Sequence, residues 1–186
     1  MDIHRVCALI AQNALSSLED VTPDQIAYFR RRVEGAASIF CVAQGRSGYV
    51  LRCFCMRLMH MGYRAYFAGE TVTPPMGPGD ILVALSGSGR TSCTCALIER
   101  AKAAGGRTFG ILGTRHSPME GSLDDVISIE VKSSDPNETG TVSLIQPLGS
   151  PFEQAAFMLL EAVAQDLFER QGGDQRALQQ RHTNLE

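Results

Sequence analysis

The sequence lacks several signatures that would assign a protein to a common functional class. It contains no Gly-Lys-Ser or Gly-Lys-Thr, so the loop that holds nucleoside triphosphates in P-loop proteins is absent. None of its six cysteines forms a Cys-x-x-Cys pair, and no apolar run is long enough to span a bilayer. A signal peptide is not evident either. We therefore expect a cytoplasmic protein without a membrane anchor.

An excess of positive charge is also missing. The 186 residues have a formal net charge of −3, so no overall basic field indicates binding to nucleic acid. Two cysteine pairs, Cys53/Cys55 and Cys93/Cys95, are spaced two residues apart on expected helices, and their side chains therefore point in divergent directions. This spacing disfavours a metal site, and we interpret the cysteines as buried apolar thiols.

Two similar segments, about forty residues apart, carry the functional signal. Each consists of a short apolar run, then small residues, then the start of a helix. Unbroken apolar runs of this length are typical of strands in a parallel sheet that is covered on both faces. The first run, Phe40–Ala43, precedes Gly45-Arg46-Ser47-Gly48, and the second, Ile81–Leu85, precedes Ser86-Gly87-Ser88-Gly89-Arg90-Thr91.

These two loops have the chemistry of a phosphate site. Glycine lets the backbone turn sharply and lets a ligand approach it, while hydroxyl groups and the free N–H groups of a helix start attract an anion. One such loop alone could be a simple connection, but two at the ends of parallel strands should lie side by side, where open α/β sheets hold ligands. A dinucleotide is disfavoured because Ser92 replaces the third glycine of Gly-x-Gly-x-x-Gly.

Strand and helix patterns alternate along the chain. They predict an α/β fold with a doubly wound, five-stranded parallel sheet in a single domain: two N-terminal helices (1–35), a core (about 36–171) and a C-terminal helical tail (172–186). The second helix should start at a capping box formed by Thr22 and Gln25 and end near Gly35. Strands are expected at 38–43, 64–67, 81–85, 108–112 and 126–131. Further helices are expected at 49–61, which should be buried on more than one side, 92–104 and 152–171, with irregular stretches at 68–79 and 133–150.

Glu153 and His182 are further candidates outside the two loops. Glu153 stands in the first turn of the helix expected at 152–171, where it either complements the helix dipole or, if it faces a pocket, serves as a general base. His182 lies close to the end of the chain and is either idle or held in place by a docked tail. The residues themselves leave these alternatives open, whereas His60, inside an apolar helix, fits a structural role.

Longer segments of the sequence resemble the 6-phospho-3-hexuloisomerases of the SIS (sugar isomerase) superfamily. The resemblance covers nearly the whole chain, and the Ser86–Thr91 loop marks only the superfamily. More specific are Arg57-Leu58-Met59-His60-Met61-Gly62, Gly69-Glu70-Thr71-Val72-Thr73-Pro74, Pro147-Leu148-Gly149-Ser150-Pro151-Phe152-Glu153 and Arg181-His182-Thr183-Asn184-Leu185. The resemblance implies a flavodoxin-like sheet, a homo-oligomer of tetramer size, and no metal or organic cofactor.

The same resemblance implies an activity and a role for each site residue. The activity is interconversion of D-arabino-hex-3-ulose 6-phosphate and D-fructose 6-phosphate through an enediol, which belongs to formaldehyde assimilation by the ribulose monophosphate pathway. Glu153 would be the base, and His182, from an adjacent subunit, would move a hydroxyl proton or open the sugar ring. The phosphate would be held by Ser47 and the Ser86–Thr91 loop, with Gly45, Arg46, Gly48, Gly87, Ser88, Gly89, Arg90 and Thr91 as further binding residues.

Two alternatives to this activity stay open at this point, as do the roles of two arginines. The chain could be another SIS isomerase, acting on arabinose 5-phosphate or sedoheptulose 7-phosphate, or a non-catalytic module that senses sugar phosphates. The arginines Arg46 and Arg90 could bind phosphate, be solvated or pair with a carboxylate. A functional coupling to the synthase that makes hexulose 6-phosphate would follow from the first activity.

Overall fold

The computed structural model describes residues 2–131 and 146–185, so most of the irregular stretch expected at 133–150 lies outside the described residues. The sheet has five strands in the order β2-β1-β3-β4-β5, and all neighbours are parallel. This is the strand order of flavodoxin-like sheets, which confirms the predicted fold. The strands are β1 (Ile39–Val42), β2 (Ala65–Phe67), β3 (Ile81–Ser86), β4 (Arg107–Leu112) and β5 (Asp125–Ser128).

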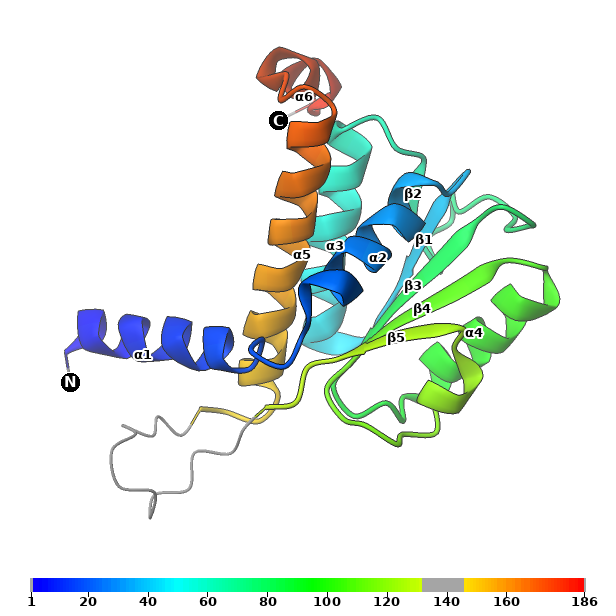
Figure 1. The fold of residues 1–186 in the computed structure, drawn as a ribbon. Helices are drawn as coiled ribbons and strands as arrows, with labels where there is room; N and C mark the ends of the chain where they lie inside the picture. Colours follow the sequence, from blue (N-terminus) through cyan, green and yellow to red (C-terminus); the bar gives the residue numbers. More distant parts are fainter. Residues whose placement is uncertain (1, 132–145, 186) are drawn as a thin grey trace.

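Helices cover both faces of this sheet. Figure 1 shows α2, α3 and α5 on one face, α4 on the other, and α1 projecting away from the rest of the chain. The helices are α1 (Ile3–Ser16), α2 (Pro23–Glu34), α3 (Gly45–His60), α4 (Ser92–Ala103), α5 (Ser150–Arg170) and α6 (Gln175–Arg181), with a 3₁₀ turn, η1 (Glu120–Ser122). None of the helices within the described ranges is both long and apolar enough to cross a membrane.

The capping box predicted for α2 is present. The Gln25 N–H donates to the Thr22 hydroxyl oxygen at 3.3 Å, and the Thr22 N–H donates to the Gln25 side-chain oxygen at 2.9 Å. The helix then ends at Gly35, as expected. These contacts satisfy backbone groups that the first turn of a helix leaves unpaired. Because the two residues are only three positions apart, the start of α2 could be predicted from the sequence.

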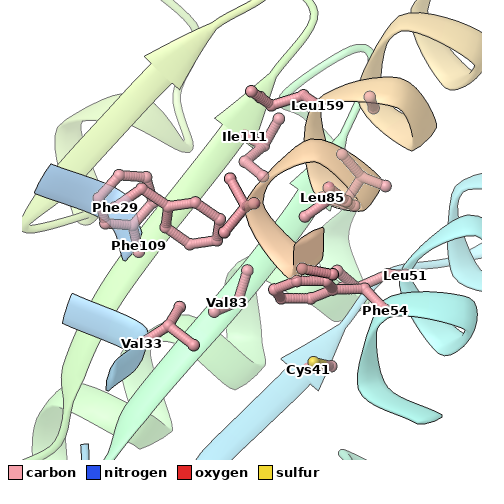
Figure 2. Close-up of a cluster of buried hydrophobic side chains, with 14 of the residues drawn as sticks. Phe29, Val33, Cys41, Leu51, Phe54, Val83, Leu85, Phe109, Ile111 and Leu159 are labelled. Atoms are coloured by element: carbon pink, nitrogen blue, oxygen red, sulfur yellow. The ribbon is translucent and has the colours of Figure 1, made fainter. Parts of the chain in front are cut away.

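The strands send alternate side chains to the two faces of the sheet. Figure 2 shows Val83, Phe109 and Ile111 on the face that α2, α3 and α5 cover; there the rings of Phe109 and Phe29 of α2 lie 4.7 Å apart. On the opposite face, Leu82 packs in a second apolar cluster that α4 covers. Burial on both faces is what the unbroken apolar runs predicted.

Two expectations for the α3 region are wrong. Gly45–Gly48 is not a loop: the chain turns at Gly45, whose φ is +59°, and the segment is already the first turn of α3. The helix is also not buried on several sides. Leu51 and Phe54 lie on one buried stripe, while Tyr49 and Met56 are exposed by 74% and 47%. Spacing of three and four residues places only one stripe of a helix against the sheet.

Smaller corrections concern the thiols and the ends of elements. Of the cysteines interpreted as buried, Cys41 and Cys55 are buried, but Cys7, Cys53 and Cys93 are exposed. The strand expected at 126–131 ends at Ser128, and α5 starts two residues earlier than expected. Proline is tolerated in the first turn of a helix because the N–H that it lacks has no partner there, so α5 includes Pro151.

Candidate phosphate-binding and catalytic site

The two segments predicted to bind phosphate, Gly45–Gly48 and Ser86–Thr91, lie at the same edge of the sheet. They follow the neighbouring strands β1 and β3: β1 ends at Val42, which pairs with Ala84, and β3 ends two residues further on, at Ser86. From here the chain runs to opposite sides, since β2 follows β1 on one side and β4 follows β3 on the other. Such a switch point is where open α/β sheets hold their ligands, and the N-termini of α3 and α4 both begin there.

The Ser86–Thr91 loop is shaped by its own hydroxyl groups. Ser86 is buried, and its Oγ accepts a hydrogen bond from the Gly89 N–H at 3.1 Å and lies 3.4 Å from Thr91 Oγ1. Ser88 is exposed, with its Oγ accepting from the Arg90 N–H at 3.3 Å. Ser86 therefore holds the loop in shape, and Ser88 faces the solvent from which a ligand would arrive.

Glycine is required at position 89 of this loop for two reasons. Its φ is +59°, a left-handed conformation that other residues rarely adopt. A Cβ added there would also lie only 2.3 Å from the Oγ of Ser117, a distance at which atoms overlap. The segment around Ser117 thus packs directly against the loop and limits the shapes that it can take.

The N-terminus of α5 rests on the same loop through Phe152. A Cβ added at Gly87 would lie 3.1 Å from the Phe152 ring, and one added at Gly113 would lie 2.9 Å from the ring and 2.6 Å from the Gly87 carbonyl oxygen. The absence of side chains at these two glycines therefore lets Phe152 approach the loop. The sequence gives no signal for this role of Gly113 other than its position directly after β4.

Glu153 follows Phe152 and lies at the switch point. The Glu153 side chain is only 10% exposed, and its Oε2 lies 2.5 Å from Nε of Arg46 in the first turn of α3, whose side chain is 68% exposed. The positive end of the α5 dipole and the guanidinium both attract the negative charge of this carboxylate. The structure thus brings together the first turn of α3, the Ser86–Thr91 loop and Glu153.

His182 lies elsewhere in the same chain. Its ring stacks on His60 with centroids 5.1 Å apart, at the end of α3 opposite Arg46, and Arg181 donates to the His60 carbonyl oxygen at 3.3 Å. Burial, followed by the nearby charges of His182 and Arg57, lowers the pKa of His60. Since the 16 residues of α3 span about 24 Å, His182 and Glu153 of one chain do not share a site.

The cysteines are not arranged as metal ligands. Within residues 2–131 and 146–185, no three His, Cys, Asp or Glu side chains are grouped so that they could hold a metal ion. Instead, Cys41 of β1 and Cys55 of α3 share a hydrogen bond between their thiols. That bond and burial raise the pKa of Cys41, and the same bond lowers the pKa of Cys55.

Comparison with known proteins agrees with this arrangement. The SIS domain family matches residues 33–155, from within α2 to within α5. A 3-hexulose-6-phosphate isomerase of Mycobacterium gastri is 36% identical over 185 residues, which cover 100% of this chain and 92% of that protein. The Bacillus subtilis 3-hexulose-6-phosphate isomerase is 33% identical, with coverages of 94% and 92%.

A solved structure extends the likeness to three dimensions. The crystal structure of a Methanococcus jannaschii protein, from which a 3-hexulose-6-phosphate isomerase function was inferred, superposes with a TM-score of 0.84 and 31% identity. The superposition covers 98% of this chain and 99% of that one. The chain therefore belongs to the SIS domain family and, within it, to the family of the 3-hexulose-6-phosphate isomerases.

Proposed function

We propose that this protein interconverts D-arabino-hex-3-ulose 6-phosphate and D-fructose 6-phosphate. The observation that carries the proposal is the position of Glu153: a nearly buried carboxylate in the first turn of α5, bound to Arg46 in the first turn of α3, while the adjacent Phe152 packs against the Ser86–Thr91 loop. This combination offers a seat for a phosphate and one base next to it. Membership of the 3-hexulose-6-phosphate isomerase family supports the choice of substrate.

The chemistry needs one base that serves two adjacent carbons. The phosphate binds at the N-termini of α3 and α4, where Ser47, Ser88 and backbone N–H groups donate hydrogen bonds, and this fixes the sugar carbons relative to Glu153. Glu153 removes the proton from C2 of the hexulose, which leaves an enediolate with its charge on the C3 oxygen. The proton of the C2 hydroxyl then passes to the C3 oxygen, and Glu153 returns its proton to C3 as the carbonyl forms at C2. The dipoles of the converging helices stabilise the charge of the enediolate.

A substitution of Glu153 tests this function. The hexulose 6-phosphate is supplied by its synthase from ribulose 5-phosphate and formaldehyde, and fructose 6-phosphate is detected by coupling to NADPH formation. Glu153→Gln should lower kcat by about 10²- to 10⁴-fold, the usual contribution of a general base. Glu161→Gln, on the same helix but two turns further on, is the matched control and should retain activity. A fully active Glu153→Gln enzyme would remove Glu153 from the mechanism, and turnover of other phosphosugars alone would change the substrate.

The proposal includes an oligomer, with a tetramer as the expected form. Exposed apolar side chains on α1 and α3, such as Ile3, Tyr49 and Met56, supply surface for contacts between subunits. In such an assembly, His182 of one chain would serve the Glu153 site of another. Mixing inactive Glu153→Gln and His182→Ala proteins should then restore part of the activity, because some mixed oligomers contain an intact site. Light scattering gives the mass, and mixtures that stay inactive would argue against a shared site.

A further inference from the structure

Arg46 occupies an unusual position between the two halves of the proposed site. It belongs to the first turn of α3, directly before Ser47, and yet its Nε is bound to the carboxylate of Glu153 on α5, 107 residues further along the chain. Two-thirds of its side chain is exposed, whereas the carboxylate is nearly buried. The partner that can move is therefore the arginine.

A sugar phosphate would compete for this guanidinium. A phosphate monoester carries a charge of about −1.5 to −2 and has three acceptor oxygens, whereas Glu153 offers one negative charge. Arginine also matches phosphate in a two-pronged geometry that uses its planar fork. Because Arg46 lies in the same helical turn that would bind the phosphate, it can reach this ligand by rotating its side chain.

We propose that Arg46 is a positioning residue that couples phosphate binding to catalysis. In the free protein its guanidinium holds the Glu153 carboxylate at the N-terminus of α5, and when a sugar phosphate binds, the guanidinium turns to the phosphate. The Oε2 atom of Glu153 is then released to accept the proton from the sugar carbon. This inference rests on the function proposed above and adds to it: the phosphate group acts as a trigger as well as an anchor.

The coupling implies discrimination against sugars without a phosphate. When D-fructose enters the site, Arg46 would still be bound to the Glu153 carboxylate. Its turnover would then be slow because the base is not free to accept a proton, and not only because the sugar binds weakly. A separate dianion that binds at the phosphate site should draw Arg46 away from Glu153 and so increase the turnover of D-fructose. If Arg46 only bound the phosphate, it would change the concentration of sugar at which the enzyme is saturated but not the rate at saturation. The binding role and the coupling role therefore predict different results.

The experiment follows proton exchange at C3 of D-fructose in D₂O by NMR, with and without phosphite dianion. Phosphite should accelerate exchange by the wild-type protein by at least about tenfold, the smallest effect expected when one hydrogen bond to a charged group is exchanged. Arg46→Gln leaves the Glu153 carboxylate without this partner, so exchange in the absence of phosphite should already be about tenfold faster or more, and phosphite should add no further acceleration. Added guanidinium ion should slow this exchange again. Arg46→Lys keeps the positive charge but not the planar guanidinium group. Its acceleration by phosphite should lie between that of the wild type and that of Arg46→Gln.

Arg52→Gln is the matched control. Arg52 lies on the same helix and also forms an ion pair, with Glu70, but on the stretch of α3 beyond the site. This variant should respond to phosphite as the wild type does. Phosphite activation that persists in Arg46→Gln, or exchange without phosphite that is no faster in Arg46→Gln than in the wild type, would overturn the coupling. Failure of the wild-type protein to convert fructose 6-phosphate would refute the proposed function instead, so the two failures are distinguishable.

Discussion

Replacing Gly89 by alanine tests whether the shape of the phosphate loop depends on one close contact. Gly89 has φ +59°, and an added Cβ would lie 2.3 Å from Oγ and 2.4 Å from Cβ of Ser117. A left-handed backbone costs a non-glycine residue about 1–2 kcal/mol, and overpacking costs about 1–3 kcal/mol. The free energy of unfolding should therefore fall by about 2–5 kcal/mol, which lowers Tm by about 2–4 °C for each kcal/mol in a chain of this size.

Gly45 provides a matched control for this prediction. It has the same φ of +59°, but a Cβ added there meets no atom within 4 Å. Gly45→Ala should thus cost only the backbone part, about 1–2 kcal/mol. The reduced freedom of the unfolded chain is common to both variants and cancels in their difference.

Urea unfolding followed by circular dichroism measures both free energies. Adding Ser117→Gly to Gly89→Ala should recover part of the lost stability, because it removes the two atoms that a Cβ at 89 would overlap. Equal losses in the Gly45 and Gly89 variants would refute the reasoning. So would a double variant that is no more stable than Gly89→Ala.

Two further predictions concern the tail and the thiols. Burial and then the charge of His182 lower the pKa of His60, so as the pH falls this histidine is protonated in the unfolded chain before it is protonated in the folded one. The free energy of unfolding should therefore decrease as the pH drops below about 6.5, and it should decrease less in His60→Asn. Urea unfolding at each pH measures both. An equal decrease in both proteins would contradict this assignment. Iodoacetamide should modify exposed Cys53 in the folded protein but buried Cys41 only after unfolding, as followed by peptide mass mapping. Equal rates at the two positions would show that Cys41 is accessible.

Features that depend on near neighbours in the chain were predictable. The apolar run of β3, the capping box of Thr22 and Gln25, and the alternation of strands with helices each rest on interactions within a few residues or on a repeating pattern. They led to the predictions of the parallel sheet and of two serine-glycine segments that meet at its switch point. The first-turn position of Glu153 was equally local and is present in α5.

Features that depend on packing between distant segments were not predictable. Phe152 of α5 packs against Gly87 and Gly113, and no local pattern in the sequence predicts this contact. The one-sided burial of α3 also follows from which neighbours cover the helix. Patterns of apolar residues show which face of a helix can be buried, but they do not show which other element will pack against it.

For this protein, short-range chemistry in the amino-acid order specified a doubly wound sheet and two serine-glycine segments at one edge of it, and it led to a prediction of which residues bind a sugar phosphate. Only the folded chain showed that Arg46 reaches Glu153 and that His182 stacks on His60 far from that pair. The physical reason is that a side-chain contact depends on the distance between atoms, and residues more than a hundred positions apart come within hydrogen-bonding distance only when the helices carrying them have packed.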